Sequence, residues 1–277
     1  EPQWLANRGY AALSVNFRTP LGFGKAFVNA GDREWGGRMD DDLLDAVAWA
    51  VAEGIADPAR VGIMGTSYGG YATLAALARN PDTYACGIDV VGPANLETLL
   101  RTVPPYWEAF RAQLIRAIGD PDTAEGLDLM RARSPVHRAG RIRAPLLFAQ
   151  GANDPRVKQA ESDQMVAALD ANGIPVTYLL FPDEGHGFVR PVHRLAFYAP
   201  AESAIVMAKS FLKDQKRVLP AATHLTGQYR QNNLYVRVPA GIDARGVWKV
   251  IEFPSHHDAK GWLTNSVYAV EGCLERC

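Results

Sequence analysis

The chain has 277 residues, of which 48% are hydrophobic and 21% are charged, an ordinary balance for a globular protein that buries a sizeable core. The formal net charge is -1, so no overall electrostatic attraction to nucleic acid or to a membrane surface is expected. No run of about 18 apolar residues occurs, and the sequence therefore predicts no membrane-spanning helix.

The first ten residues have the pattern of a helix that is coming to its end. Gly9 follows Gln3–Arg8 at the position where a C-cap glycine is usual. A domain seldom begins in the last turns of a helix, so we expect the chain to be an N-terminally truncated piece of a longer protein. The chain itself shows no signal peptide, and the sequence leaves room for one upstream of Glu1.

Between residues 11 and 211, short apolar runs alternate with helical patterns. The apolar runs are continuous, which is typical of strands that are covered on both faces. We expect strands at 11–15, 61–64, 87–91, 145–149 and 176–181, helices at 40–51, 71–78, 158–171 and 193–211, and an irregular helical stretch at 94–134. Strands that alternate with helices predict an α/β domain with a mostly parallel sheet.

This alternation stops after about residue 213. Residues 234–238 and 247–251 have the composition of strands, but nothing in the sequence shows what they pair with. We therefore divide the chain into an α/β domain over residues 1–213 and a C-terminal tail over residues 214–277, whose role the sequence leaves open. We expect the tail to pack loosely on the domain and to supply no catalytic residue.

The three cysteines, Cys86, Cys273 and Cys277, have a spacing that fits neither a disulfide framework nor a zinc site. Cys86 falls in a predicted buried strand, where we expect it to be a small core residue. Cysteine usage leaves the compartment open, and we favour the cytoplasm. The segment His256–Asp258 has metal-binding residue types, but no further ligand is placed by spacing, so a solvated tail is the better interpretation. We expect no metal and no organic cofactor.

The segment Gly65-Thr66-Ser67-Tyr68-Gly69-Gly70 is the most informative part of the chain. It has the pattern Gly-x-Ser-x-Gly and lies between a predicted strand and a predicted helix. Glycines on both sides of Ser67 allow a sharp turn and keep side chains away from the serine. Alone, the pattern also fits a plain Gly-rich turn. In this context it predicts a nucleophile elbow, with Ser67 Oγ at the carboxyl end of the sheet and a helix N-terminus beside it.

A serine hydroxyl is a weak nucleophile, so it needs a base within hydrogen-bond reach and a third group that orients the base. Asp154 directly follows the fourth predicted strand, and His186, which has a glycine on each side, directly follows the fifth. The carboxyl ends of parallel strands meet at one edge of a sheet, where ligands bind. We therefore expect Ser67, Asp154 and His186 to converge there.

Each of these residues also has a simpler interpretation. Asp154 lies in an Asn-Asp-Pro sequence, which is common in turns, and His186 alone fits a histidine on a surface loop. Asp183 and Glu184 compete for the role of the acid, but they are too close to His186 in sequence to orient its ring easily. Three such groups in this order on three loops are much harder to attribute to chance than any one of them.

Several segments of residues 1–213 form a characteristic set: Gln3-Trp4-Leu5-Ala6-x-Arg8-Gly9-Tyr10, Val15-Asn16-Phe17-Arg18, Gly22-Phe23-Gly24, Trp35-Gly36, Gly65-x-Ser67-Tyr68-Gly69-Gly70-Tyr71, Gly151-x-x-Asp154-x-Arg156-Val157 and Gly185-His186-Gly187-Phe188. In these the chain resembles the prolyl oligopeptidase family of serine peptidases, in particular its acylaminoacyl-peptidase and dipeptidyl-peptidase-like members. The resemblance implies an α/β-hydrolase fold with Ser67, Asp154 and His186 as a catalytic triad. Arg156 matches an arginine that anchors a substrate carbonyl in some members, and a surface salt bridge is the alternative role for it.

The chain departs from the pattern of the family in three places. Members usually carry a His-Gly-Gly-Pro-like segment, which contributes to the oxyanion site, upstream of the region around Trp4, and an N-terminal β-propeller that restricts access to small peptides. Both are absent from this chain, so the resemblance implies a catalytic domain that is N-terminally incomplete. The sequence Arg18-Thr19-Pro20-Leu21 replaces the more usual Arg-Gly-Ser-Thr-like turn, and the tail matches nothing in the family.

Together these observations predict a serine-type peptidase that acts on short peptides through an acyl-enzyme. The backbone N–H of Tyr68, the residue after the nucleophile, is the expected oxyanion donor on this chain. An esterase or another small-molecule serine hydrolase is the nearest alternative, because the same triad serves both. A non-catalytic binding module on a hydrolase fold is a further alternative, and the intact set of Ser67, Asp154 and His186 argues against it.

Overall fold

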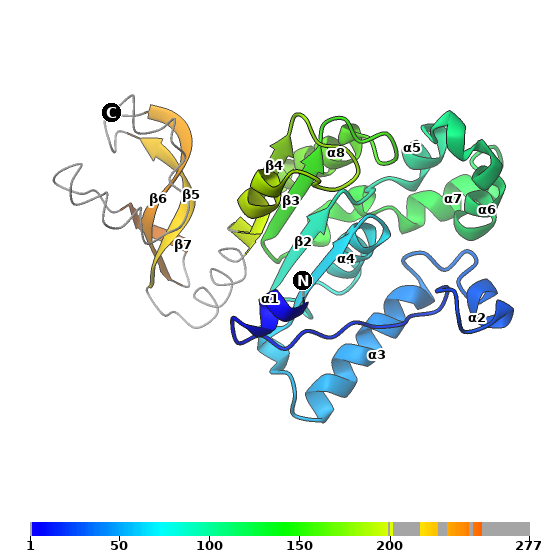
Figure 1. Cartoon of the computed structure of the whole chain (residues 1–277), viewed down its shortest axis with the longest axis horizontal. Helices are drawn as coiled ribbons and strands as arrows, with labels where there is room; N and C mark the ends of the chain where they lie inside the picture. The colour runs from blue at the N-terminus through cyan, green and yellow to red at the C-terminus, as the bar shows by residue number, and fades with distance from the viewer. Residues whose placement is uncertain (1, 199, 202–216, 227–231, 244–245, 251–277) are drawn as a thin grey trace. The chain divides into compact units, whose positions relative to one another are not determined.

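The computed structural model of the chain describes residues 2–198, 200–201, 217–226, 232–243 and 246–250. The chain separates into two units, Glu1–Val189 and Arg190–Cys277. The first unit contains, in chain order (Figure 1), α1 (Pro2–Ala6), α2 (Lys25–Asn29), α3 (Arg38–Ala52), η1 (Pro58–Arg60), β1 (Gly62–Thr66), α4 (Tyr68–Arg79), β2 (Cys86–Val90), α5 (Leu96–Arg101), η2 (Pro105–Trp107), α6 (Glu108–Ile118), α7 (Ala124–Arg133), η3 (Pro135–Arg141), β3 (Leu146–Gly151), α8 (Gln159–Ala171) and β4 (Val176–Phe181).

The strands of the first unit form one parallel sheet in the order β1-β2-β3-β4. In its register Gly65 lies opposite Asp89, and Asp89 lies opposite Phe148. Every residue of the two central strands, β2 and β3, is buried, whereas the edge strands β1 and β4 are mostly half-buried. The parallel α/β architecture that the continuous apolar runs predicted is therefore confirmed, and so are four of the five expected strands of the domain.

The expected strand at residues 11–15 is wrong. These residues have no regular secondary structure, and Leu13 is 53% exposed. A strand needs a neighbour whose backbone N–H and C=O groups pair with its own. Among the described residues, β1 at the edge of the sheet pairs with β2 alone and offers no partner to this segment. The apolar composition of residues 11–15 favours a strand, but no described strand pairs with these residues.

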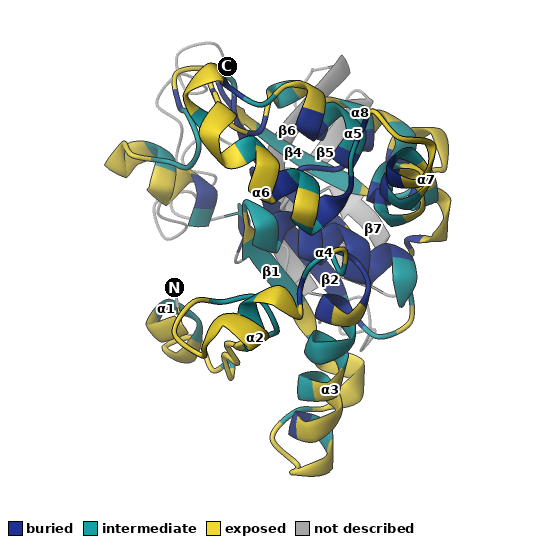
Figure 2. Ribbon diagram, turned by 90° about the vertical axis from the view of Figure 1, so that its right-hand side faces the viewer, coloured by how far each residue is buried: buried dark blue, intermediate teal, exposed yellow. Residues whose placement is uncertain are grey.

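The core lies between the sheet and two long helices. Helix α4 packs on β1 and β2, α8 packs on β3 and β4, and η3 contacts both helices. Their shared apolar layer includes Leu74, Leu77, Phe148, Met165 and Leu169. Figure 2 shows α4 almost entirely buried, whereas α3 is largely half-buried or exposed. Helix α4, which carries the residues after Ser67, is thus held on the sheet along most of its length.

The predicted helices of the first unit are confirmed, and so is the helix end near residue 9. Helix α1 ends at Ala6, and Gly9 has φ 80°, a left-handed conformation that glycine adopts without a steric penalty. The backbone N–H of Tyr10 donates to Leu5 O at 3.2 Å and that of Gly9 donates to Ala6 O at 3.0 Å, which satisfies carbonyls at the helix end.

The second unit contains an antiparallel sheet in the order β5-β6-β7, formed by β5 (Arg217–Thr226), β6 (Asn232–Asp243) and β7 (Gly246–Val250). The strand candidates at 234–238 and 247–251 lie in β6 and, up to residue 250, in β7, and each pairs with the strand next to it in sequence. Residues 191–198 are helical, in agreement with the start of the helix expected at 193–211. The rest of that helix and the boundary at residue 213 lie almost entirely outside the described residues, so the division at 213 stays a prediction.

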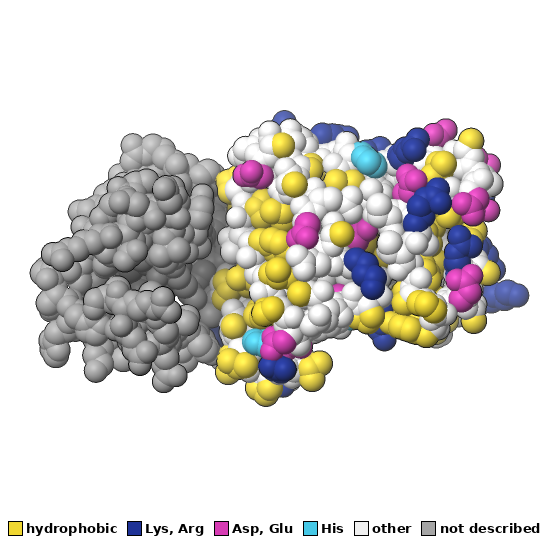
Figure 3. All heavy atoms as spheres, turned by 90° about the horizontal axis from the view of Figure 1, so that it is seen from above, with side chains coloured by type: hydrophobic (Ala, Val, Ile, Leu, Met, Phe, Trp, Pro, Cys, Tyr) yellow, Lys and Arg dark blue, Asp and Glu magenta, His cyan; other side chains and the backbone are white. Residues whose placement is uncertain are grey.

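The surface of the described part of the chain carries charges of both signs. Basic and acidic side chains are interspersed on the face seen in Figure 3. Several form exposed ion pairs between elements, such as Arg33 with Glu125 at 2.6 Å and Arg116 with Asp32 at 2.7 Å. Solvent screens such pairs, so they contribute little to stability. Of the helices that the structure describes, none has the length and apolar content that crossing a bilayer requires.

Candidate active site

Ser67 occupies a strained turn between β1 and α4. Its backbone has φ 59° and ψ -117°, a conformation that a residue with a side chain rarely adopts. Its N–H donates to Val90 O at 2.8 Å, which ties the turn to the end of β2. A Cβ built on Gly65 would lie 2.2 Å from the backbone of Gly69, so the strand and the helix approach too closely for any side chain there. The predicted elbow geometry is present, and both glycines of the pattern lie at this crossing.

The three residues predicted to converge lie together at the carboxyl edge of the sheet. Ser67 follows β1, Asp154 follows β3 and His186 follows β4. His186 Nε2 lies 2.9 Å from Ser67 Oγ, and His186 Nδ1 lies 2.7 Å from Asp154 Oδ2. A carboxylate beside Nδ1 keeps the proton on that nitrogen and leaves Nε2 free to accept the serine proton. The arrangement can thus activate the Ser67 hydroxyl.

Asp154 is fixed on its own loop as well as to the histidine. Its side chain is fully buried, and Oδ1 accepts hydrogen bonds from the backbone N–H groups of Arg156 at 2.8 Å and Val157 at 3.0 Å. The two competing acids have other surroundings. Asp183 is exposed, and Glu184 Oε2 accepts from the N–H of Val189 at 3.0 Å. Among the described contacts, the carboxylate on His186 is that of Asp154.

The loop of Asp154 and the loop of His186 bind each other directly. The backbone N–H of Asn153 donates to Glu184 O at 3.0 Å, and Asn153 Nδ2 donates to Pro182 O at 2.8 Å. A Cβ built on Gly151 would lie 2.2 Å from Gly185 O, so only glycine permits this approach. No role for Asn153 was predicted from the sequence. Its place one residue before Asp154 was the only signal, and the chain gave no indication that its amide spans two loops.

The side chain of Tyr68 belongs to an aromatic cluster behind Ser67. Its ring lies 5.4 Å from that of Phe17 and 4.5 Å from that of Trp35, measured between centroids, and its hydroxyl lies 3.7 Å from Met39 Sδ. Burial raises the pKa of the Tyr68 phenol well above its usual range, so the hydroxyl stays protonated. Tyr68 is also the first residue of α4, so its N–H lies outside the helical hydrogen-bond ladder and is placed to bind an anion.

Arg156 is exposed and stacks on an aromatic ring. Its guanidinium carbon lies 5.4 Å from the ring centroid of Trp107 at the end of η2, a cation–π distance. Trp107 and Tyr68 both pack against the apolar cluster that contains Val157. The sequence does not predict this stacking partner, because a contact across about 50 residues leaves no trace in local spacing.

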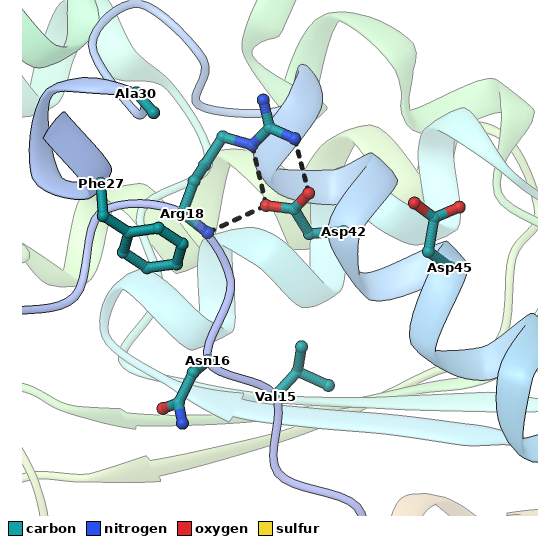
Figure 4. A pocket seen from close by; sticks show the side chains of 7 residues that line it. All are labelled: Val15, Asn16, Arg18, Phe27, Ala30, Asp42 and Asp45. Atoms are coloured by element: carbon teal, nitrogen blue, oxygen red, sulfur yellow. Dashed lines mark hydrogen bonds and ion pairs between the residues drawn. The ribbon is translucent and has the colours of Figure 1, made fainter. Parts of the chain in front are cut away.

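A pocket of about 360 Å³ lies between the segment 15–30 and α3 (Figure 4). It is lined by Val15, Asn16, Arg18, Phe27, Ala30, Asp42 and Asp45. Arg18 and Asp42 are in direct contact in its lining, where they are joined by three hydrogen bonds, from the Arg18 backbone N–H, Nε and Nη2. Ser67, Asp154 and His186 are not among its lining residues, so this hollow is not the cavity in which Ser67 would act.

The described residues contain no group of three or more His, Cys, Asp or Glu side chains that could hold a metal ion. The candidate at His256–Asp258 lies outside the described residues. Cys86 is buried in β2, as expected for a core residue, and burial raises the pKa of its thiol to about 11. That thiol is therefore protonated near neutral pH and is a poor nucleophile.

Comparison with known proteins decides the family. The sequence model of the prolyl oligopeptidase family matches residues 1–203. The chain belongs to the prolyl oligopeptidase family. It is 55% identical to dipeptidyl aminopeptidase BIII of Pseudoxanthomonas mexicana over 241 residues, which are 87% of this chain and 33% of that protein. The crystal structure of a puromycin hydrolase S511A mutant superposes with a TM-score of 0.65 at 28% identity, over 70% of this chain and 29% of that one. The predicted family and α/β-hydrolase fold are confirmed.

A second, shorter similarity concerns another class of protein. A stretch of 82 residues, 30% of this chain, is 58% identical to malate dehydrogenase of Caulobacter vibrioides and covers 26% of that protein. The chain spans between a quarter and a third of the length of these curated relatives. The family model ends at residue 203, whereas the similarity to dipeptidyl aminopeptidase BIII covers 241 residues and so extends beyond it.

Proposed function

We propose that Ser67, His186 and Asp154 form a catalytic triad that hydrolyses short peptides. The observation that carries this proposal is the continuous hydrogen-bonded chain from Ser67 Oγ through His186 to Asp154, with heavy-atom distances of 2.9 Å and 2.7 Å. The strained conformation of Ser67 supports it, because strain at a strand-to-helix turn is typical of a nucleophile elbow. Membership of a family of serine peptidases supports the class of reaction.

In the first half of the reaction, Ser67 Oγ attacks the scissile carbonyl carbon while His186 Nε2 accepts the hydroxyl proton. Asp154 holds the ring and stabilises the imidazolium that forms. The same proton is then donated from Nε2 to the leaving amine, the C–N bond breaks, and the acyl group remains on Ser67 as an ester. The backbone N–H of Tyr68 donates to the developing oxyanion.

In the second half, a water molecule takes the place of the amine. His186 Nε2 accepts a proton from the water as its oxygen attacks the ester carbon, and the proton returns to Ser67 Oγ when the C–O bond breaks. The acid product leaves and the hydroxyl of Ser67 is restored. No step of this sequence requires a metal or an organic cofactor.

We further propose that the substrate class is dipeptidyl, with cleavage after the second residue of a peptide. Two relatives that are 55% and 54% identical carry the names dipeptidyl aminopeptidase and dipeptidyl peptidase family member. We propose that exposed Arg156 binds a carbonyl of the substrate backbone, and its stacking on Trp107 and its backbone hydrogen bond to Asp154 support this role. A dipeptidyl chromogenic amide should be cleaved faster than the same compound with an acetylated N-terminus, and the reverse order would contradict the proposal.

An esterase is the alternative that the triad alone leaves open, since fold does not fix substrate. Esters need less protonation of the leaving group than amides do. The ratio of kcat/KM for an ester and an amide with the same acyl part therefore distinguishes the two. A peptidase cleaves both, whereas turnover of the ester alone would favour an esterase.

The short similarity to malate dehydrogenase does not extend to a proposed activity. It covers 82 residues of this chain and 26% of that relative, whereas the peptidase family model covers residues 1–203. We therefore propose no dehydrogenase function for this chain.

The decisive experiment compares Ser67→Ala with the unaltered chain. We expect about a 10⁶-fold loss in kcat, because the members of a triad act as a unit. A fluorophosphonate probe should label the unaltered chain and fail to label the variant. Ser14→Ala, at an exposed serine, is the matched control and should label normally. Labelling that survives Ser67→Ala, or its absence from the unaltered chain, would refute the proposed triad and support a non-catalytic binding module.

A further inference from the structure

Asp89 is a fully buried carboxylic acid that the proposed triad does not use. It lies near the carboxyl end of β2 and is 0% exposed. Its Oδ1 accepts a hydrogen bond from the backbone N–H of Gly92 at 2.9 Å. Its Oδ2 is buried and has no hydrogen-bond partner among the described residues. A carboxyl group in such a place costs stability relative to an apolar side chain, so its presence calls for a compensating role.

The hydrogen bond of Asp89 closes the turn that follows β2, and this turn holds Ser67. Val91, within the turn, has φ 48°, a strained conformation for a β-branched residue. Val90 O accepts the backbone N–H of Ser67 at 2.8 Å, and the N–H of Val91 donates to Ala149 O at 2.9 Å. The Val90 carbonyl can accept the hydrogen bond from the N–H of Ser67 only while the turn keeps this carbonyl pointed at Ser67.

The same carboxyl group is packed against the start of α4. A Cβ built on Gly70 would lie 2.1 Å from Asp89 Oδ1 and 2.7 Å from Gly92 Cα. A Cβ built on Gly92 would lie 2.5 Å from the backbone of Gly70. The turn after β2 and the first turn of α4 are therefore in direct contact, with Asp89 between them. Ser67 lies immediately before that helical turn.

We propose that Asp89 is a positioning residue for Ser67. Its carboxyl group holds the turn after β2 against the first turn of α4 and so fixes the backbone on which Ser67 Oγ and the Tyr68 N–H are placed. This inference rests on the proposed function of Ser67. It assigns to Asp89 no contact with the substrate.

The role requires a hydrogen-bond acceptor and no charge. Burial raises the pKa of the Asp89 carboxyl well above its usual range, which favours the uncharged acid. Asn has nearly the same shape, is neutral and keeps an oxygen acceptor for the N–H of Gly92. Ala keeps neither the acceptor nor the volume. A comparison of Asp89→Asn with Asp89→Ala therefore isolates the effect of the hydrogen-bond acceptor.

The test measures the rate of fluorophosphonate labelling of Ser67, together with kcat and KM on one dipeptidyl amide. We expect Asp89→Ala to lower the labelling rate and kcat by up to about 10²-fold, the effect of a small displacement of a nucleophile, with little change in KM. Asp89→Asn should restore both rates. Ile88→Val, at a buried neighbour on the same strand, is the control for plain loss of packing and should leave both rates near those of the unaltered chain.

The outcomes separate this inference from the proposed function. Equal labelling of the unaltered chain and Ser67→Ala would refute the triad itself. Normal labelling of a folded Asp89→Ala protein would overturn the role of Asp89 alone. Failure of Asp89→Asn to rescue would overturn it as well, as would a kcat loss in Ile88→Val as large as that in Asp89→Ala. If Asp89→Ala does not fold, Asp89→Leu takes its place, because it keeps a branched side chain of similar shape and has no acceptor for the N–H of Gly92.

Discussion

Asp154 uses its two carboxylate oxygens for different contacts. Oδ2 lies 2.7 Å from His186 Nδ1, while Oδ1 accepts from the backbone N–H groups of Arg156 and Val157. The hydrogen bonds from Arg156 and Val157 require an oxygen at the position of Oδ1, so the side chain is not free to rotate. The direction in which it presents Oδ2 to the histidine is thereby set by its own loop.

This division of contacts makes a sharp prediction for Asp154→Asn. The amide oxygen must remain on the N–H groups of Arg156 and Val157, which turns the NH₂ group toward His186 Nδ1. Nδ1 must then accept a hydrogen bond, and the proton moves to Nε2, the wrong tautomer for a base. We expect a loss of about 10⁴ in kcat with the fold intact.

Asp183→Asn is the matched control for that measurement, because Asp183 is an exposed acid near His186 in sequence. It should keep kcat close to that of the unaltered chain. Equal losses in the two variants would show that the acid has been assigned to the wrong residue.

At the scale of the elements, residues 15–19 are held to α3 by an ion pair and not by a sheet. Arg18 donates three hydrogen bonds to Asp42, at 2.6, 2.8 and 2.9 Å. The hydrogen bonds from Arg18 hold the pKa of the Asp42 carboxyl below its usual value. This contact replaces the strand pairing that the sequence predicted for the segment just before it.

The stability that this pair provides should therefore depend on pH. Because the pKa of Asp42 is lower in the folded chain, the stabilisation is present above the unfolded pKa of about 4 and is lost as the pH falls through the folded pKa. Asp42→Asn should lower the free energy of unfolding by about 1 kcal/mol near neutral pH, and the difference should vanish in strong acid.

Urea unfolding at the two pH values measures this effect. Asp45→Asn, one turn further along α3 at an exposed acid, is the control and should change little at either pH. A difference for Asp42→Asn that persists unchanged in strong acid would rule out the ion pair as its origin.

Thr19 stands where the usual turn of the family has glycine, and this difference has a structural consequence. Thr19 has φ 110°, a conformation that suits glycine and strains a β-branched residue. Thr19→Gly should raise the free energy of unfolding by about 1 kcal/mol, since relief of strain outweighs the extra entropy of the unfolded chain. Thr19→Ala keeps a Cβ and should give no comparable gain. If both variants gave the same change in chemical denaturation, strain would not be the cause.

At the scale of the whole chain, the candidate site is assembled from distant parts of one unit. Ser67 and His186 are 119 residues apart in sequence, and Asp154 and His186 are 32 apart. All three lie on loops of the unit that ends at Val189. Ser67, Asp154 and His186 all lie within residues 1–203, which the family model matches.

It follows that residues 214–277 should contribute no catalytic group. We expect a variant in which His224, His256 and His257 are all replaced by Ala to be labelled by a fluorophosphonate at the rate of the unaltered chain. These are the histidines of the tail and so its strongest candidates for a base. A loss of labelling in the folded variant, comparable with that of His186→Ala, would show that the tail takes part.

The sequence by itself determined four of the five expected strands of the domain, its main helices, their order and the residues that converge at the sheet edge. A buried parallel strand is apolar along its whole length, so its residues carry the signal locally. The pattern around Ser67 and the glycines beside His186 are likewise contained within a few residues. The strand expected at 11–15 failed because local propensity says nothing of whether a neighbouring strand is there to pair.

Contacts between distant segments were decided by the tertiary structure. The amide of Asn153 across two loops and the stacking of Arg156 on Trp107 depend on which segments lie side by side. The close approach of Gly65 to Gly69 and of Gly70 to Gly92 depends on how α4 crosses the sheet. Hydrogen bonds and van der Waals contacts depend on which atoms lie close together in space, and the sequence gives only the order of residues along the chain.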